Sequence, residues 1–143
     1  MIERITAEEA RLAALWAQGF VEPIGGATPA AASRMGEDRR VFLVRDMVRH
    51  LGAVQLDTIS VLARSHELVP YARFGSLGRA NVERAYWDDA TTFEYWSHAA
   101  CILPMGSWPL FAFRRRFKLE ELHEYLTAHQ EGDLEGALDG LRD

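Results

Sequence analysis

The chain has 143 residues, of which 48% are hydrophobic and 26% charged, a composition that predicts one globular core and excludes both wholesale disorder and two full-sized domains. Its single cysteine, Cys101, excludes an internal disulfide, and no segment reaches the ~20 apolar residues of a membrane span, so we expect a cytoplasmic protein. The net charge of −5 is concentrated in residues 118–143, which hold eight acidic and two basic side chains, so the nearly neutral remainder neither requires nor excludes a nucleic-acid partner.

The first fifty residues are predicted to form two helices separated by a loop. Thr6-Ala7-Glu8-Glu9 is a capping box and predicts a helix that ends at Gly19. Residues 22–38 are rich in proline, glycine, alanine and serine, which predicts a loop. Apolar side chains at helical spacing predict a second helix over residues 39–51, and Gly52 is placed to end it.

A short strand is predicted directly after this helix. Residues 53–59 alternate between two faces, with Val54 and Leu56 on one and Gln55 and Asp57 on the other. Two residues along a strand lie ~6.6 Å apart, which is twice the rise per residue. The side chains of Gln55 and Asp57 are therefore expected to converge on one point.

The segment after the strand is predicted to be helical from about Ser60 to Glu67, with Pro70 breaking the helix. Gly75 and Gly78 are predicted to bracket a turn. A helix with these bounds would follow directly on the strand that carries Asp57. Asp57, or Thr58, would then be placed to cap it.

The second half is predicted to continue with one helix and one extended segment before it becomes helical again. Asn81 is predicted to cap a short helix that ends at Trp87. The aromatic and β-branched residues near the start of 91–103 predict an extended segment, closed by Pro104. Apolar spacing then predicts helices over 107–117 and 119–130.

The C-terminal residues 133–143 carry an apolar stripe at helical spacing with no cap after it. The stripe consists of Leu134, Ala137, Leu138 and Leu141. An amphipathic helix needs a surface to lie against. Either it opens a second module that is missing here, or it docks on the only domain. As an exposed helix it would also offer a route to an oligomer.

The order of elements predicts an α+β, mostly helical fold, namely a winged helix-turn-helix module with an extra C-terminal helix. The module is expected to span residues 1–118. The acidic helical segment 119–143 is expected to begin a further module. No phosphate-cradling glycine loop, nucleophile elbow or zinc-ligand spacing is present, so we expect neither a cofactor nor a metal.

Three blocks of sequence follow one another along the chain. They are the predicted first helix with Gln18-Gly19, LGAVQLDTISVLARSHEL at 51–68 followed by YARFG at 71–75, and FEYWSHAA at 93–100. Together they resemble crosslink-repair DNA glycosylases of the YcaQ/AlkZ type, since the first block fits the start of these proteins and the other two fit their two signatures. The resemblance covers most of residues 5–118. It implies tandem winged-helix modules around a DNA channel, and excision of alkylated purines, including those in interstrand crosslinks, from double-stranded DNA.

The resemblance also implies roles for individual residues. The family's catalytic signature is Gln, an apolar residue, then Gln or Asp, and Gln55-Leu56-Asp57 matches its Asp version. Arg64 and Arg73 flank this signature and are expected to contact DNA. Members of the family continue well beyond this first module, so the activity of a lone module is a separate question.

Two residues of the aromatic block are further candidates for the DNA surface. His98 is read by default as an ordinary core or surface histidine, and the resemblance adds a role in the wall of the site. Trp96 is most simply a core aromatic residue, or alternatively a residue that stacks on a nucleobase.

The chemistry can be argued from the residues themselves. An N7-alkylated guanine is cationic and already a good leaving group, so its removal requires little general acid. Asp57 would deprotonate the attacking water or stabilise the oxocarbenium-like sugar, and Gln55 would position the water. The simpler interpretation makes Asp57 or Thr58 a helix cap and Gln55 a surface residue.

Two functions without catalysis remain open. One is a winged-helix DNA-binding protein or transcriptional regulator whose helix near residues 60–67 enters the major groove. The other is a non-catalytic fragment whose 133–143 helix pairs with another chain. The first predicts sequence-specific, salt-dependent DNA binding without base release, and the second predicts an oligomer.

Overall fold

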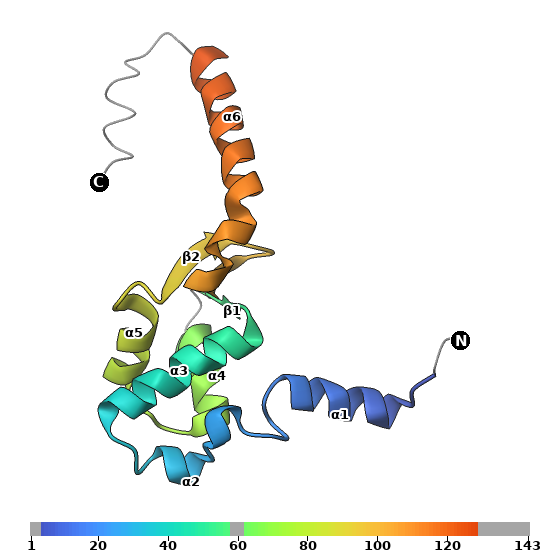
Figure 1. Ribbon diagram of the computed structural model, residues 1–143, viewed down its shortest axis with the longest axis vertical. Coiled ribbons are helices and arrows are strands. Elements are labelled where there is room, and N and C mark those ends of the chain that lie inside the picture. The colour runs from blue at the N-terminus through green and yellow to red at the C-terminus, as the bar shows by residue number, and fades with distance from the viewer. Residues whose placement is uncertain (1–3, 58–61, 129–143) are drawn as a thin grey trace. The chain divides into compact units, whose positions relative to one another are not determined.

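The computed structural model describes residues 4–57 and 62–128 (Figure 1). It divides the chain into two compact units, residues 1–106 and 107–143, and each is described by itself. Helices predominate and three short strands form one antiparallel sheet, so the predicted α+β, mostly helical class is confirmed. The elements are α1 (Ala7–Ala17), η1 (Ile24–Gly26), α2 (Pro29–Ala32), α3 (Glu37–Leu51), β1 (Val54–Gln55), α4 (Ser65–Phe74), α5 (Arg79–Trp87), β2 (Thr92–Trp96), β3 (Ala100–Pro104), η2 (Met105–Phe111) and α6 (Ala112–Ala128).

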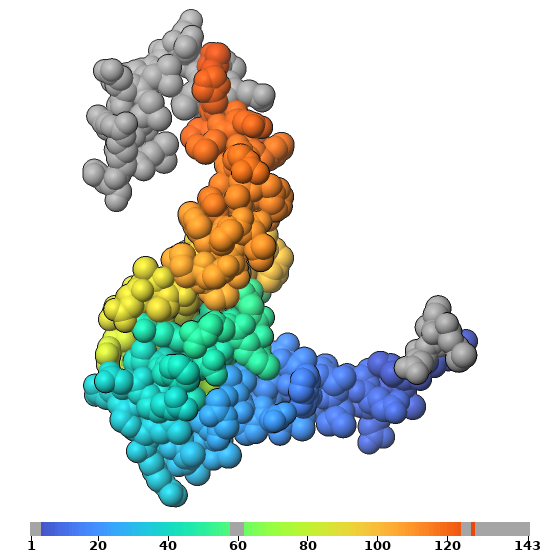
Figure 2. Space-filling view, viewed as in Figure 1, coloured from blue at the N-terminus to red at the C-terminus, as the bar shows by residue number. Residues whose placement is uncertain are grey.

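Helix α3 supplies the centre of the core in the first unit. Its buried side chains recur at helical spacing and are Val41, Leu43, Val44, Met47 and Val48. They pack with apolar residues from α4, α5 and the sheet, and α5 lies directly against α3 in the space-filling view (Figure 2). Gly52 ends the helix in the left-handed conformation, with φ +76°. Glycine suits this position because a residue with a side chain would be strained there. The predicted stop is confirmed, and the helix begins at Glu37 rather than at residue 39.

The capping box of α1 is confirmed. The backbone N–H of Glu9 donates to Thr6 Oγ1 at 3.2 Å, and the backbone N–H of Thr6 donates to Glu9 Oε2 at 2.7 Å. Gln18 is the C-cap residue, and Gly19 follows with φ +73° as the expected stop. None of the residues of α1 is buried.

The prediction of an irregular loop over residues 22–38 is wrong in part, because the segment contains two short helical turns, η1 and α2. Thr28 caps α2 by accepting the backbone N–H of Ala31 at 3.3 Å. Pro29 occupies the first helical position, where its missing N–H is not needed. The proline that suggested a loop therefore begins a helix.

The prediction of a helix broken by Pro70 is wrong. Helix α4 begins at Ser65 and continues through Pro70, while the predicted start at Ser60 lies outside the described residues. A proline within a helix leaves the carbonyl four residues earlier without its N–H donor. Here that carbonyl belongs to His66, and the hydroxyl of Tyr86 donates to it at 2.8 Å. The phenol of α5 thus replaces the missing backbone donor.

Replacing Tyr86 with phenylalanine is expected to lower the free energy of unfolding by about 1–3 kcal/mol, because the buried carbonyl of His66 then loses its donor. Urea denaturation followed by circular dichroism measures the change. Tyr71→Phe is the matched control, since Tyr71 is 60% exposed. Equal stability of the two variants would contradict the compensating role of Tyr86.

Asn81 is not a cap, which corrects the sequence prediction. Helix α5 begins two residues earlier, at Arg79, after Gly78 with φ +84°. Asn81 lies buried within the helix and its Nδ2 donates to the carbonyl of Leu77 at 2.8 Å. The predicted end of the helix at Trp87 is confirmed.

The extended segment predicted over residues 91–103 is a hairpin rather than one strand. Strands β2 and β3 pair antiparallel around residues 97–99. Strand β1 pairs with the other edge of β3, which gives the sheet order β1-β3-β2. The turn Ser97-His98-Ala99 contains no glycine, proline, asparagine or aspartate, and Ser97 is its one residue of a type common in turns.

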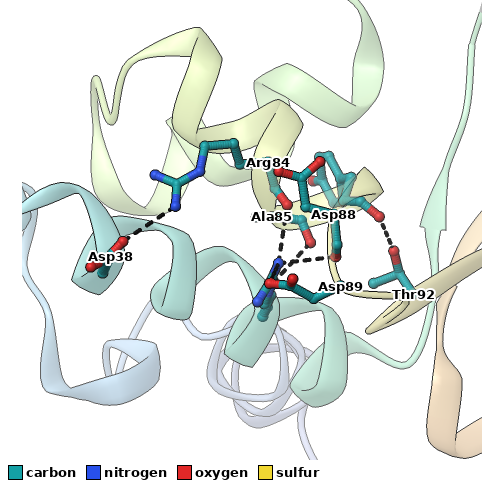
Figure 3. Close-up of polar contacts among 8 residues, drawn as sticks. Asp38, Arg84, Ala85, Asp88, Asp89 and Thr92 are labelled. Carbon is teal, nitrogen blue, oxygen red and sulfur yellow. Dashed lines mark hydrogen bonds and ion pairs between the residues drawn. The ribbon is translucent and has the colours of Figure 1, made fainter.

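Arg45 joins α3 to the C-terminal end of α5. Its guanidinium donates to the carbonyls of Ala85 at 3.2 Å, Arg84 at 3.1 Å and Asp88 at 3.0 Å. Asp89 Oδ2 accepts a further bond from it at 3.1 Å. A cation at this position complements the negative end of the helix dipole and satisfies carbonyls that lack helical partners. Figure 3 shows the residues at this end of α5, among them Ala85, Asp88 and Asp89.

In the second unit, the two helices predicted over 107–117 and 119–130 are replaced by η2 and the continuous helix α6. Arg115 stacks over Trp108, with 3.9 Å from its guanidinium carbon to the ring centroid. Its Nη1 donates to the carbonyl of Trp108 at 2.7 Å. The predicted helix at 133–143 lies outside the described residues. Among the described helices, none is both long and apolar enough to cross a membrane.

Candidate functional site

The Gln-Leu-Asp motif lies on β1 and the residues directly after it. Val54 is 2% exposed and Leu56 packs on the core, whereas Gln55 and Asp57 are exposed. The predicted alternation is therefore confirmed for the described residues 54–57. Because neighbouring residues of an extended chain point to opposite faces, Gln55 and Asp57 share the face away from the core.

The sheet brings the motif beside the second signature block. Gln55 pairs with Cys101 of β3, and Cys101 pairs with Tyr95 of β2. The backbone pairing continues past β1, since the N–H of Leu56 donates to the carbonyl of Ala100 at 2.8 Å. The motif therefore runs toward the closed end of the hairpin, where residues 97–99 form the turn.

Trp96 and His98 occupy this end of the hairpin. Trp96 is 64% exposed and is therefore not the core aromatic residue of the simpler interpretation. It pairs with Ala100, so its side chain projects from the face opposite to that of Gln55. His98 is exposed, and its Nδ1 lies 4.0 Å from Cys101 Sγ. Both residues are near the motif, but Trp96 does not share its face.

Arg64 lies beside the motif at the start of α4. It is the N-cap residue of this helix and is exposed. The next residue, Ser65, donates its hydroxyl to the carbonyl of Gln55 at 2.8 Å. This bond ties the first turn of α4 to β1, so the cation of Arg64 belongs to the surroundings of the motif.

Arg73 is engaged elsewhere in the fold. Its guanidinium donates to the carbonyl of Gln18 at 2.8 Å, to Gln18 Oε1 at 3.0 Å and to the carbonyl of Val69 at 2.9 Å. The guanidinium carbon also lies 4.5 Å from the ring centroid of Phe20. Burial lowers the pKa of Arg73. These contacts hold the segment after α1 against α4, and a DNA contact by Arg73 stays a prediction.

Cys101 is fully buried next to Gln55 in the sheet. Burial raises the pKa of its thiol, an effect partly opposed by a hydrogen bond to the backbone of Ala99. A buried thiol of raised pKa is a poor nucleophile. We expect a thiol reagent at neutral pH to label the native chain at least tenfold more slowly than the urea-unfolded chain, as mass spectrometry would measure. Equal labelling rates would show that the sheet opens readily at the motif.

A pocket of about 370 Å³ opens between α4 and α5. Its lining is mainly apolar, with Leu68, Tyr71 and Val82 among the walls, and Glu67 and Arg79 supply its charges. Neither Gln55 nor Asp57 lines this pocket. The candidate catalytic pair is therefore exposed and not part of the lining of this pocket.

A cluster of metal-ligating side chains was missed by the sequence analysis, which predicted no metal site. His66, Glu67 and Glu83 each present one ligand atom, and these atoms lie within 4.8 Å of one another. The separation of α4 from α5 along the chain produces none of the short ligand spacings that identify a metal site in a sequence. Only the adjacent pair His66-Glu67 could have drawn attention to it.

The exposed cations of α5 are paired with acidic residues. Arg79 Nη2 lies 3.0 Å from Glu67 Oε1, and Arg84 Nη2 lies 3.2 Å from Asp38 Oδ1. The latter pair joins α5 to the first turn of α3 (Figure 3). Acidic side chains next to each arginine weaken the attraction of this helix for phosphates.

The family model described as DNA glycosylase AlkZ-like matches residues 48–143. The chain belongs to the AlkZ-like DNA glycosylase family. The match confirms the resemblance seen in the sequence, and its range includes the motif on β1, helices α4 and α5, and the hairpin. No solved structure matches the chain.

Proposed function

We propose that this AlkZ-like chain is a monofunctional DNA glycosylase module that hydrolyses the N-glycosidic bond of N-alkylated purines in double-stranded DNA. The observation that carries the proposal is the exposed pair Gln55 and Asp57 on one face of an anchored strand. The pairing of Gln55 with Cys101 and the hydroxyl of Ser65 on its carbonyl support the backbone at this point. A backbone held in this way keeps catalytic groups in one geometry.

In the proposed reaction, an N-alkylated purine leaves as a neutral base because it was cationic while attached to the sugar. The bond from the sugar carbon to the base nitrogen breaks, and a bond to a water oxygen forms. Asp57 accepts the proton of that water or stabilises the positive charge on the sugar. Gln55 holds the water through its amide, which can both donate and accept a hydrogen bond.

The arrangement of the first unit supports a winged helix-turn-helix module. Helices α3, α4 and α5 precede the hairpin, and β1 between α3 and α4 joins the hairpin at β3. The hairpin would be the wing, with Trp96 and His98 at its closed end. We propose that these two residues and Arg64 contact DNA around the lesion.

The exposure of Gln55 and Asp57 indicates how large a damaged base the site could accept. Gln55 and Asp57 are exposed and do not line the 370 Å³ pocket, so a base held at the pair need not fit into an enclosed cavity. This favours bulky substrates, including bases that are joined to the opposite strand. Crosslink unhooking is therefore part of the proposal.

The regulator alternative receives less support. In a helix-turn-helix module, the helix that enters the major groove is the second of the pair, which here is α5 rather than the helix near residues 60–67 that was expected from the sequence. Its arginines are paired with Glu67 and Asp38. A groove-reading helix needs cations and donors available to the DNA.

The test is release of free base from DNA treated with a methylating agent. The expected result is release of 7-methylguanine above the spontaneous rate, with untreated DNA of the same sequence unchanged. Liquid chromatography with mass spectrometry identifies the released base. Sequence-specific binding without any base release would instead support the regulator.

A further inference from the structure

The cluster of His66, Glu67 and Glu83 joins the first turn of α4 to α5. Its ligand atoms lie within 4.8 Å of one another. In a tetrahedral zinc site with bonds of ~2.1 Å, ligand atoms lie about 3.4 Å apart. Binding would therefore need the three ligand atoms to approach one another by about 1.4 Å at most, between two helices that are already in contact.

His66 is the feature that separates this cluster from an ordinary surface ion pair. The residue is 3% exposed, and within the described part of the chain its Nδ1 has no hydrogen-bond partner. Its Nε2 lies 4.0 Å from Glu83 Oε1, which is beyond hydrogen-bond distance. Nε2 is therefore the ring nitrogen that would bind an ion, and its 4.0 Å separation from the carboxylate oxygen fits an ion bound between them at ~2.1 Å from each.

The carboxylate of Glu83 is already oriented toward this histidine. Trp87 Nε1 donates to Glu83 Oε2 at 2.8 Å, which leaves Oε1 facing His66. A partner of this kind, which fixes the direction of a ligand from outside the site, is typical of metal centres. Imidazole and carboxylate are both ligand types that Zn²⁺ accepts, and three protein ligands are the number found in sites that keep a fourth position open.

We propose that His66, Glu67 and Glu83 form a binding site for a divalent cation of the zinc type, which fastens α4 to α5. The open coordination position would face the 370 Å³ pocket, since Glu67 and Arg79 line it. The guanidinium of Arg79, 3.0 Å from Glu67 Oε1 and 3.9 Å from Glu83 Oε1, occupies the place of the cation. Its side chain is 73% exposed, so it can turn into solvent when the metal binds.

The experiment measures binding of Zn²⁺ alone to the full chain after treatment with a chelator. Isothermal titration calorimetry is expected to give one ion per chain, and Co²⁺ is expected to give the absorption bands of a site with four or five ligands. Glu83→Gln is expected to weaken binding at least about tenfold, because it removes a charged ligand. The matched control is Glu37→Gln, which neutralises an exposed carboxylate that is also paired with an arginine of α5.

A second variant tests the site in the opposite direction. Arg79→Ala removes the competing cation and is expected to tighten Zn²⁺ binding severalfold. This variant keeps all three proposed ligands. His66→Gln is a poorer test because the residue is buried and its loss can disturb folding. Absence of Zn²⁺ binding, binding that survives Glu83→Gln, or binding that Arg79→Ala leaves unchanged would each overturn the proposal. Circular dichroism of every variant establishes that its helices are intact.

Discussion

Replacing Asp57 with asparagine is expected to lower the rate of 7-methylguanine release by about 10²-fold or more, the range that a general base contributes. The amide has nearly the same shape but cannot accept the proton of water, and it carries no charge to stabilise the sugar. Asp57 is exposed just after β1, and circular dichroism of the variant establishes that its fold is intact. Single-turnover assays on methylated DNA measure the effect directly.

Glu94→Gln is the matched control for this experiment. Glu94 is an exposed carboxylate on β2, and it pairs with Ile102, which places it on the face opposite to Gln55. We expect its loss to change the rate less than twofold. Undiminished release by the Asp57 variant would refute its catalytic role, and equal losses in both variants would indicate a general effect of charge on the sheet.

Replacing Arg45 with methionine is expected to lower the free energy of unfolding by about 3 kcal/mol, since several hydrogen bonds to a charged group are lost together. The carbonyls of Arg84, Ala85 and Asp88 would lose their donor at the end of α5. The methionine keeps most of the apolar stem of the side chain. The loss therefore reports the guanidinium rather than packing.

Arg49→Met provides the comparison, one helical turn further along α3. Its guanidinium pairs with Asp46 at 3.3 Å and its central carbon lies 5.6 Å from the ring centroid of Phe42, while half of the side chain is exposed. An exposed pair of this kind contributes little, so a change below about 1 kcal/mol is expected. Similar losses of unfolding free energy in the two variants, measured by urea denaturation, would contradict the role of Arg45 in joining α3 to α5.

Local signals in the sequence predicted the parts of the fold that local forces determine. The capping box at Thr6, the left-handed stop at Gly52 and the alternation around Gln55 depend on neighbouring residues alone. Each of them is confirmed in the described residues. The same alternation placed Gln55 and Asp57 on one face.

Three wrong predictions concern residues whose local character is overridden by a contact that the sequence does not show. Pro70 should break a helix, but Tyr86 supplies the donor that the proline lacks. Asn81 has the character of a cap, but its side chain bonds to Leu77 from within the helix. The hairpin turn at 97–99 has Ser97 as its one residue of a type common in turns, a weak signal, so the turn is defined mainly by the pairing of β2 with β3.

The composition of the candidate site was predictable, but its arrangement was not. Nothing in the spacing of residues indicates that Gln55 pairs with Cys101, because register depends on the whole sheet. The arrangement therefore divides the predicted contacts: Arg64 lies beside the motif, Trp96 projects from the other face, and Arg73 binds Gln18.

The pairing of β1 with β3 also has a consequence for how the chain acquires its shape. Strand β1 emerges early in synthesis, whereas β3 follows only after α4 and α5, and contacts between distant segments form slowly because a long loop must first close. The helices can form locally before that closure. The surroundings of Gln55 should then be among the last parts of the first unit to become native, and amide protons of β1 should gain protection from exchange later than those of α3.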